Sequence, residues 1–276
     1  MDKMIIELKS KQFPNTYYQK KGNGPSILLI HGFGEDAMIW THQIACLQEQ
    51  YTVIIPDLPG SGKSNLPSTE LSIELLADFV FEIVEQEQIS LVILLGHSMG
   101  GYITAAFAKK YPDRLLGIGF IHSSVYADDD LKKETRLKSI QLIERGEEEK
   151  IEFLKIAIPN LYAEHSKLNK KPDINQHLTN TFSISSSTLI AYTKAMMMRP
   201  DNTQVLTELN NPILFVVGNE DKAVSPKDNF KQSALAKDCF IYLLPNVGHM
   251  AMVEDKDNLQ KIINRFLEYV LQHKIV

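Results

Sequence analysis

The segment 96–101, with the sequence GHSMGG, carries the residue types of a nucleophilic site. It follows a continuous apolar run and precedes the helix-like stretch YITAAFAKKY. A serine between such segments can sit in a strained turn that pushes its hydroxyl out above a sheet. Gly96 and Gly100 would remove side chains where the strand and the helix nearly touch. The sequence therefore predicts Ser98 as a nucleophile, and the alternative is an ordinary turn that contains a serine.

A serine hydroxyl becomes a good nucleophile only when a base takes its proton. A strand–serine–helix turn of this kind is followed along the chain by an acid and then by a histidine. Asp221 comes shortly after the apolar run 212–218, and His249 comes after the run 239–245. We predict that His249 is the base and that Asp221 holds its imidazole in the required tautomer.

Other residues could compete for these roles. Glu220 is a rival acid beside Asp221, and Asp57 is a weaker rival because it precedes the serine. Three further histidines stand at predicted strand ends but lie upstream of the acid: His31, His97 and His122.

Negative charge develops on the substrate oxygen as serine attacks, so backbone N–H groups must point at that oxygen. We expect the amides of Met99, at the start of the helix, and Phe33, in the segment HGFGE, to form this oxyanion hole. The residues expected to line the substrate pocket are Gly32, His97, Met196 and Met250. Methionine suits an apolar acyl pocket, but it equally suits a packed interface between helices and core.

The segment PGSGKS (59–64) looks like a phosphate-binding loop, but its spacing is wrong. Such a loop needs a glycine five positions before its second glycine, and Asp57 stands there. A carboxylate at that point would repel phosphate. We therefore expect no nucleotide, and the sequence shows no cluster that predicts another cofactor or a metal ion.

Six short runs are apolar almost throughout and without alternation, which is typical of strands buried on both faces of a parallel sheet. They span 26–30, 51–58, 91–96, 115–122, 212–218 and 239–245. Segments with helical spacing of apolar residues lie between them, notably 71–87 and 259–271. This alternation predicts an α/β fold, a three-layer sandwich with a mostly parallel central sheet of about eight strands. Residues 5–20 are expected to form a hairpin at its edge.

The alternation of strands and helices breaks once. Residues 124–205 are polar and helical in pattern, with Gly146 as a helix stop. We interpret 124–205 as a helical cap inserted into a core formed by 1–123 and 206–276.

Composition narrows the classes of partner. The 276 residues carry a net charge of −5, which leaves no basic surface for nucleic acid or an anionic membrane. The first residues lack the apolar stretch of a leader, and the two cysteines suit reduced, buried thiols. We expect a cytoplasmic monomer or homodimer that acts on a small molecule.

Together these motifs resemble those of the α/β-hydrolase fold family. HGFG, DLPGSGKS, GHSMGG, GNED and GHM occur in the family's order and approximate spacing over nearly the whole chain. The resemblance implies that Asp57, Gly60, Gly62 and Ser64 form a loop after the third strand, beside the active site. It also implies a serine hydrolase with a helical cap, of the carboxylesterase or lipase type.

The resemblance leaves the substrate open. Epoxide hydrolases and haloalkane dehalogenases of this fold use aspartate as nucleophile, which Ser98 argues against. Carbon–carbon bond hydrolases often have asparagine where this chain has His97, so a small carboxylic ester is favoured. A carbon–carbon bond hydrolase, a thioesterase, a perhydrolase or a ligand-binding receptor with little turnover are the alternatives.

If PGSGKS does not bind phosphate, its lysine is dispensable. We expect Lys63→Ala to retain ester hydrolysis within about twofold of wild type, since surface substitutions away from special features have small effects. ATP and GTP should leave the melting temperature of the wild type unchanged. A nucleotide-dependent rise in melting temperature that Lys63→Ala abolishes would contradict this interpretation.

Overall fold

A computed structural model describes residues 4–272 of the chain. The first three residues of the N-terminal segment, and His273, which we expect in the last helix, lie outside the described residues.

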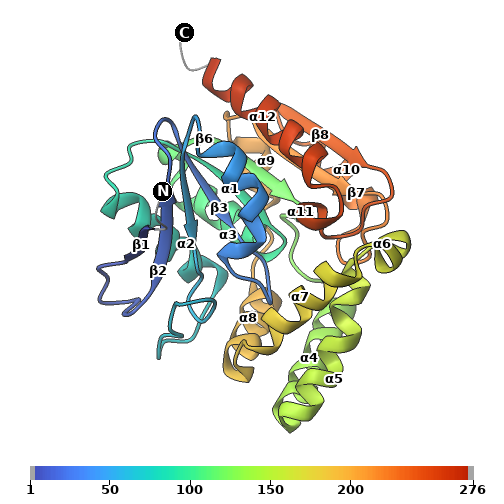
Figure 1. Ribbon diagram of the computed structural model, residues 1–276. Coiled ribbons are helices and arrows are strands. Elements are labelled where there is room, and N and C mark those ends of the chain that lie inside the picture. Colours follow the sequence, from blue (N-terminus) through green and yellow to red (C-terminus); the bar gives the residue numbers. More distant parts are fainter. Residues whose placement is uncertain (1–3, 273–276) are drawn as a thin grey trace.

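Within the described residues, eight strands form one sheet (Figure 1). They are β1 (Met4–Glu7), β2 (Tyr17–Lys21), β3 (Ser26–Ile30), β4 (Thr52–Pro56), β5 (Val92–His97), β6 (Leu115–Ile121), β7 (Ile213–Gly218) and β8 (Cys239–Leu244). Their order is β1-β2-β4-β3-β5-β6-β7-β8. Neighbours from β4 to β8 pair in parallel, whereas β1 and β2 form an antiparallel edge. The predicted α/β fold and its edge hairpin are confirmed.

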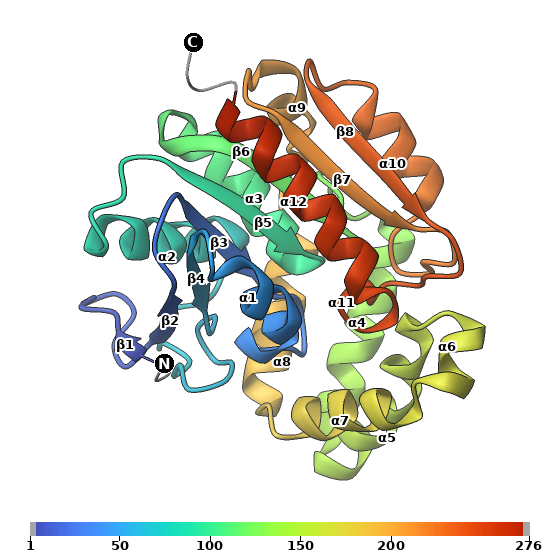
Figure 2. The ribbon, with the colours of Figure 1, turned by 45° about the horizontal axis from the view of Figure 1, so that its top comes forward.

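The inner strands β3 to β7 are apolar almost throughout because both faces of the sheet are covered there, whereas the edge strand β8 is only partly buried. In β3, Leu28 faces one hydrophobic core, while Ile27 and Leu29 face the other. One core contains α1 (Thr41–Leu47) and α12 (Lys256–Gln272), and the other contains α2 (Ile73–Gln86), α3 (Met99–Lys110) and α9 (Thr203–Glu208). The helix α10 (Pro226–Ser233) packs beside α9 (Figure 2). Full burial on both faces is the reason for the absence of polar alternation.

The chain between β6 and β7 is helical. It contains α4 (Asp130–Arg145), α5 (Glu147–Ala157), α6 (Glu164–Asn169), α7 (Lys171–Phe182) and α8 (Ser186–Met198), followed by α9. Helices α4 to α8 gather beside the end of the sheet toward which β7 and β8 point (Figure 1). Gly146 is the C-cap residue of α4, as predicted, with a φ of 153° and a ψ of 179° that residues with a side chain rarely adopt. The division at 124 and 205 stays a prediction; α9 crosses the second boundary and packs into the core.

The loop after β4 is organised by Asp57. Its two carboxylate oxygens accept hydrogen bonds from the Ala37 and Lys63 amides, both at 3.0 Å, and its carbonyl accepts one from the Ser64 hydroxyl at 2.7 Å. Gly62 adopts a φ of 53°, and a Cβ there would lie 2.3 Å from the Asp57 carboxyl carbon. The carboxylate thus occupies the place that a phosphate would need.

The expectation of buried thiols is wrong for Cys46. It is exposed, because α1 turns Gln43, Ile44 and Leu47 toward the core instead. Cys239 is partly buried, and burial followed by the charge of Asp238 raises its pKa to about 11. Both cysteines are free.

Among residues 4–272, no helix is both long enough and apolar enough to span a membrane.

We expect the Asp57 side chain to stabilise the folded protein more than the Lys63 side chain of the same loop does. Asp57→Ala would leave the Ala37 and Lys63 amides without their acceptor, so we expect the free energy of unfolding to fall by about 2–3 kcal/mol. Urea denaturation measures the change. Lys63→Ala is the matched control, because its exposed side chain should contribute less than about 0.5 kcal/mol. Equal stability of the two variants would contradict this role for Asp57.

Candidate active site

Ser98 occupies a strained turn between β5 and α3. Its φ of 50° and ψ of −115° are rarely adopted by residues with a side chain. The conformation is held from both sides: the Ser98 amide donates to the Ile121 carbonyl at 3.0 Å, and the Ser123 hydroxyl donates to the Ser98 carbonyl at 2.6 Å. Ser98 is thereby fixed at the carboxyl end of the central strand.

The glycines on either side of Ser98 allow this turn to form. A Cβ on Gly96 would lie 2.2 Å from the Gly100 carbonyl oxygen. A Cβ on Gly100 would lie 2.3 Å from the Ile30 carbonyl oxygen, in β3. Both contacts are with backbone, which cannot move aside as a flexible side chain can. Glycine is therefore required at both positions.

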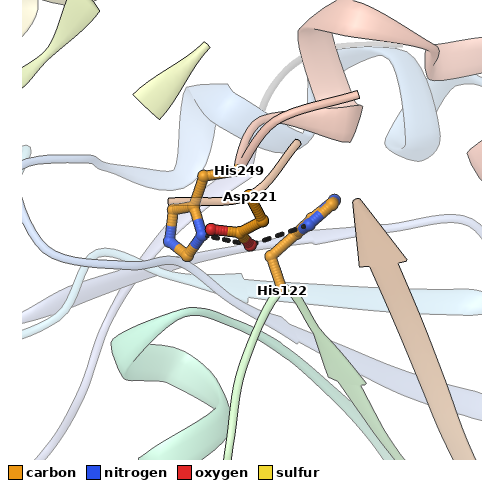
Figure 3. Close-up of side chains that lie close together, drawn as sticks. All are labelled: His122, Asp221 and His249. Atoms are coloured by element: carbon orange, nitrogen blue, oxygen red, sulfur yellow. Dashed lines mark hydrogen bonds and ion pairs between the residues drawn. The ribbon is translucent and has the colours of Figure 1, made fainter. Parts of the chain in front are cut away.

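Asp221 and His249 meet at the ends of β7 and β8. His249 Nδ1 lies 2.8 Å from Asp221 Oδ2, and both side chains are buried (Figure 3). Asp221 Oδ1 accepts hydrogen bonds from the Ala223 and Val224 amides at 2.8 and 2.9 Å. With a carboxylate on Nδ1, the His249 ring carries a hydrogen there, and Nε2 is left as the basic nitrogen.

Burial alone would raise the pKa of Asp221. Two histidines outweigh this effect of burial. The attraction of His249, followed by the hydrogen bonds of His122 and His249, holds the pKa of Asp221 far below its usual range. Asp221 is therefore a carboxylate at neutral pH. A permanent negative charge at this point stabilises an imidazolium on His249 during proton transfer.

His122 is a residue near Asp221 that the sequence did not assign to the site. Its Nδ1 lies 3.4 Å from Asp221 Oδ2, so Asp221 stands between two imidazoles (Figure 3). His122 is fully buried and has a φ of 49°. Burial, against the opposing attraction of Asp221, lowers its pKa from 6.5 to about 4. His122 is therefore neutral at pH 7. Its place directly after β6 is the feature of the sequence that could have indicated its position near the site.

Glu254 was also missed, and it holds the segment around His249. Its Oε1 accepts hydrogen bonds from the Gly248 amide at 3.0 Å and the Met250 amide at 3.1 Å. Its Oε2 accepts one from Ala163, in the helical segment, at 2.8 Å. One carboxylate thus joins the His249 loop to the helices that lie over the sheet. Nothing in the local sequence distinguishes Glu254 from a surface acid.

The oxyanion hole formed by the Phe33 and Met99 amides stays a prediction; Met99 directly follows Ser98, and Phe33 lines the same cavity as Ser98. Met99 is the first residue of α3, and Phe33 lies in the loop after β3. Among the described residues neither amide donates to a protein acceptor. Both are therefore free to bind a substrate oxygen.

Ser98 and His249 line one cavity of about 740 Å³. Phe33, His97 and Asp221 contribute from the core, and Met196 contributes from α8. Helix α4 adds charged groups from the opposite side, namely Lys132 and Arg136. The cavity lies between the sheet and the helical segment, and its volume suits a small organic molecule.

Two of the expected pocket residues lie elsewhere. The Met250 side chain is fully buried in the core with α1 and α12, so it does not line the cavity. Gly32 packs behind the cavity: a Cβ there would lie 3.1 Å from Ser98 Cβ. Trp40 is also fully buried in the core that contains Met250.

The rival acids have other contacts. Glu220 Oε2 accepts a hydrogen bond from the Glu164 amide at 3.3 Å, and Asp57 holds the loop after β4. That loop borders a separate hollow of about 610 Å³, where Lys63 is accompanied by the carboxylates of Glu35, Asp36 and Asp57. This balance of charge does not favour a polyphosphate.

Three side chains of the site have the chemistry of metal ligands. The ligand atoms of His122, Asp221 and His249 lie within 4.8 Å of one another. A metal ion among them would have to replace the 2.8 Å hydrogen bond between His249 and Asp221. The expectation that the chain uses no metal stays a prediction.

The chain belongs to the alpha/beta hydrolase fold family, whose pattern residues 25–256 match. A thermophilic esterase from Thermogutta terrifontis, solved with malate bound, has a TM-score of 0.88 and 27% identity over 98% of this chain and 99% of that one. The enol-lactonase from Burkholderia xenovorans LB400 shares the fold, with a TM-score of 0.83 and 20% identity over 92% and 97% of the two chains.

Particular relatives extend this likeness to sequence. The 2-(acetamidomethylene)succinate hydrolase of Mesorhizobium japonicum is 24% identical over 91% of this chain and 90% of that protein. An uncharacterized protein of Mycobacterium tuberculosis is 39% identical over 98 residues, which are 34% of this chain and 29% of that protein. The chain thus matches less than a third of the length of that relative. Relatives that align along most of both chains are hydrolases, which supports hydrolase activity here.

His122 generates a prediction about stability in acid. Because its pKa is about 4 in the folded protein and 6.5 ordinarily, the unfolded chain binds more protons between these values, and stability falls as the pH is lowered. His122→Gln removes this proton uptake. We expect the variant to lose about 1–2 kcal/mol less stability than wild type between pH 7 and pH 5, by urea denaturation.

The exposed His165 provides the control for this measurement. His165→Gln should show the same loss between pH 7 and pH 5 as wild type. Parallel behaviour of the His122 variant and wild type would mean that His122 takes up its proton over the same pH range in the folded and the unfolded protein.

Proposed function

We propose that this protein is a serine hydrolase that cleaves a small carboxylic ester through an acyl-enzyme intermediate. The observation that carries the proposal is the hydrogen bond of 2.8 Å between Asp221 and His249, in a cavity that also contains Ser98 in a strained turn. A neutral imidazole with one nitrogen fixed by a carboxylate, next to a serine, is the arrangement that activates a hydroxyl.

In the proposed reaction the Ser98 hydroxyl attacks the ester carbonyl while His249 Nε2 takes its proton. The Phe33 and Met99 amides bind the oxyanion, and His249 then gives its proton to the departing alcohol. Water enters, loses a proton to His249, and attacks the acyl carbonyl; Ser98 leaves with that proton as the acid is released. Asp221 stays ionised throughout and stabilises the imidazolium.

The helical segment supplies the substrate walls in this proposal. Met196 and Phe153 present apolar surface to the cavity. Thr193 adds a hydroxyl, but its Oγ1 already donates to the Leu189 carbonyl at 2.7 Å. The described walls thus offer little polar recognition near Met196, which suits a short acyl chain.

A second candidate is the hydrolysis of an acylated substrate that carries carboxylate groups. The M. japonicum relative is named for a succinate derivative, and the cavity here includes Lys132 and Arg136. Arg136 pairs through its Nε with the buried Asp128 and also lines the cavity. Comparing a neutral ester with an ester of the same acyl length that bears a carboxylate distinguishes the two.

The proposal predicts the effect of removing the nucleophile. Ser98→Ala should lower kcat for p-nitrophenyl acetate or butyrate by at least about 10³-fold, because the remaining groups cannot form an acyl-enzyme. Ester hydrolysis is followed by p-nitrophenol release, and circular dichroism checks the fold.

Ser233→Ala, at a partly exposed serine at the end of α10, is the matched control and should retain full activity. Binding of esters by wild type without turnover would support a receptor instead. Activity of Ser98→Ala above a few per cent of wild type would rule out Ser98 as the nucleophile.

A further inference from the structure

Glu35 and His97 form a buried contact behind the proposed nucleophile. Glu35 lies in the loop after β3, and His97 is the last residue of β5. His97 Nδ1 is 2.9 Å from Glu35 Oε2, and that oxygen also accepts the Gly32 amide at 2.7 Å. The two side chains are 1% and 2% exposed, so water does not screen them.

The partners of His97 determine its protonation. Its Nε2 lies 2.9 Å from the His249 carbonyl oxygen, while its Nδ1 faces the Glu35 carboxylate. A carbonyl oxygen only accepts, and the Gly32 hydrogen bond to Oε2 favours the ionised carboxylate. Both ring nitrogens must therefore carry hydrogens, which makes His97 an imidazolium.

His31, directly after the neighbouring strand β3, has hydrogen-bond partners of a different kind. Its Nδ1 donates to the Gly32 carbonyl at 2.9 Å, and its Nε2 accepts from the Leu58 amide at 3.0 Å. One donor and one acceptor fit the neutral ring. Burial is equal for the two histidines, so the difference in charge comes from the partners alone.

The electrostatics agree with this geometry. Burial alone would raise the pKa of Glu35, but the charge and hydrogen bond of His97 lower it to about 2. Burial alone would lower the pKa of His97, but the charge and hydrogen bond of Glu35 raise it above its ordinary value. The other titratable groups that face the pair are His122, Tyr162, His177, Asp221 and His249.

We propose that Glu35 and His97 are a carboxylate–imidazolium pair that positions the oxyanion hole against the nucleophile. This inference rests on the proposed function of Ser98. The pair joins three segments: the loop that carries Phe33, the turn that carries Ser98, and the backbone of His249. These are the segments whose relative positions the proposed reaction requires.

Gly32 shows how closely the pair lies behind the reacting groups. A Cβ at Gly32 would lie 3.0 Å from His97 Nδ1, 3.1 Å from Glu35 Oε2 and 3.1 Å from Ser98 Cβ. A small displacement of either partner would therefore be transmitted to Phe33 and Ser98. A misplacement of about 1 Å at a reacting centre can lower a rate on the order of 100-fold.

The charge of His97 has a second consequence. A fixed positive charge immediately before Ser98 lies near the place where negative charge develops in acyl transfer. Because the pair is already formed, no reorganisation is needed when the oxyanion appears. Glu35 and His97 are positioning residues in this role, since they act through the segments that carry Phe33 and Ser98.

The protonation of His97 is measured directly by two-bond proton–nitrogen NMR of ¹⁵N-histidine-labelled protein at pH 7.5. We expect one buried histidine with both nitrogens protonated, assigned by its loss in His97→Gln. His31, with one protonated nitrogen, is the internal reference. A wild-type spectrum in which His97 has only one protonated nitrogen would overturn the proposal, whatever the activity.

Glu35→Gln tests the role of the charge. The amide oxygen can still accept from Gly32, but the negative charge is gone, so His97 should lose its proton at a lower pH. We expect kcat to fall about 10- to 100-fold with KM changed less than about threefold. The rate of the variant should fall further as the pH rises through the lowered pKa of His97, a decline absent in wild type.

Glu49→Gln, at an exposed acid, is the matched control and should follow wild type. The double variant Glu35→Gln/His97→Gln should be less impaired than the product of the two single effects, because no unpaired charge is left buried. Purely multiplicative effects, or a Glu35→Gln variant with the wild-type pH profile, would overturn the pair.

Failure of the two proposals can be told apart. If wild type and Ser98→Ala are equally inactive, the hydrolase proposal fails, while the spectrum of His97 still decides whether the pair exists. If Glu35→Gln does not fold, the wild-type spectrum and the double variant decide it.

Discussion

The close approach of backbone to backbone at the turn between β5 and α3 constrains the rest of the site. Gly96 faces the Gly100 carbonyl so closely that no side chain fits, and Gly100 in turn packs on β3. Glycine at both positions allows Ser98 its φ of 50° at the carboxyl end of β5, where Ser98 lines the cavity. Because parallel strands end at the same edge, the loops after β3, β7 and β8 can then meet Ser98.

Carboxylates fix these loops and the loop after β4, each by accepting hydrogen bonds from backbone amides. Asp57 holds the loop after β4, Asp221 holds the segment after β7, and Glu254 holds the segment around His249. Glu35 does the same for Gly32 and adds the contact with His97. A carboxylate accepts several hydrogen bonds at once, so a single side chain can order a loop that has no secondary structure of its own. The loops that follow the strands are thus held in place by hydrogen bonds to these carboxylates.

The sequence predicted the core better than the site. Apolar runs identified β3 to β8 to within a residue or two, because burial on both faces favours short continuous apolar runs. The glycines around Ser98 predicted the turn for a similarly local reason. Met250 was misplaced because a methionine next to a functional histidine can face the cavity or the core, and only packing decides. Cys46 was misplaced because one residue of helical phase separates a buried from an exposed position.

By itself, the sequence determined the α/β architecture and the order of Ser98, Asp221 and His249 along it, since these depend on local spacing and on the periodicity of burial. Only the tertiary structure decided that His122 stands beside Asp221, and that Glu35, 62 positions before His97, provides the counter-charge for that ring. Charge states of buried groups depend on the partners that surround them in space. Those partners come from loops distant in sequence, so no local pattern could have indicated them.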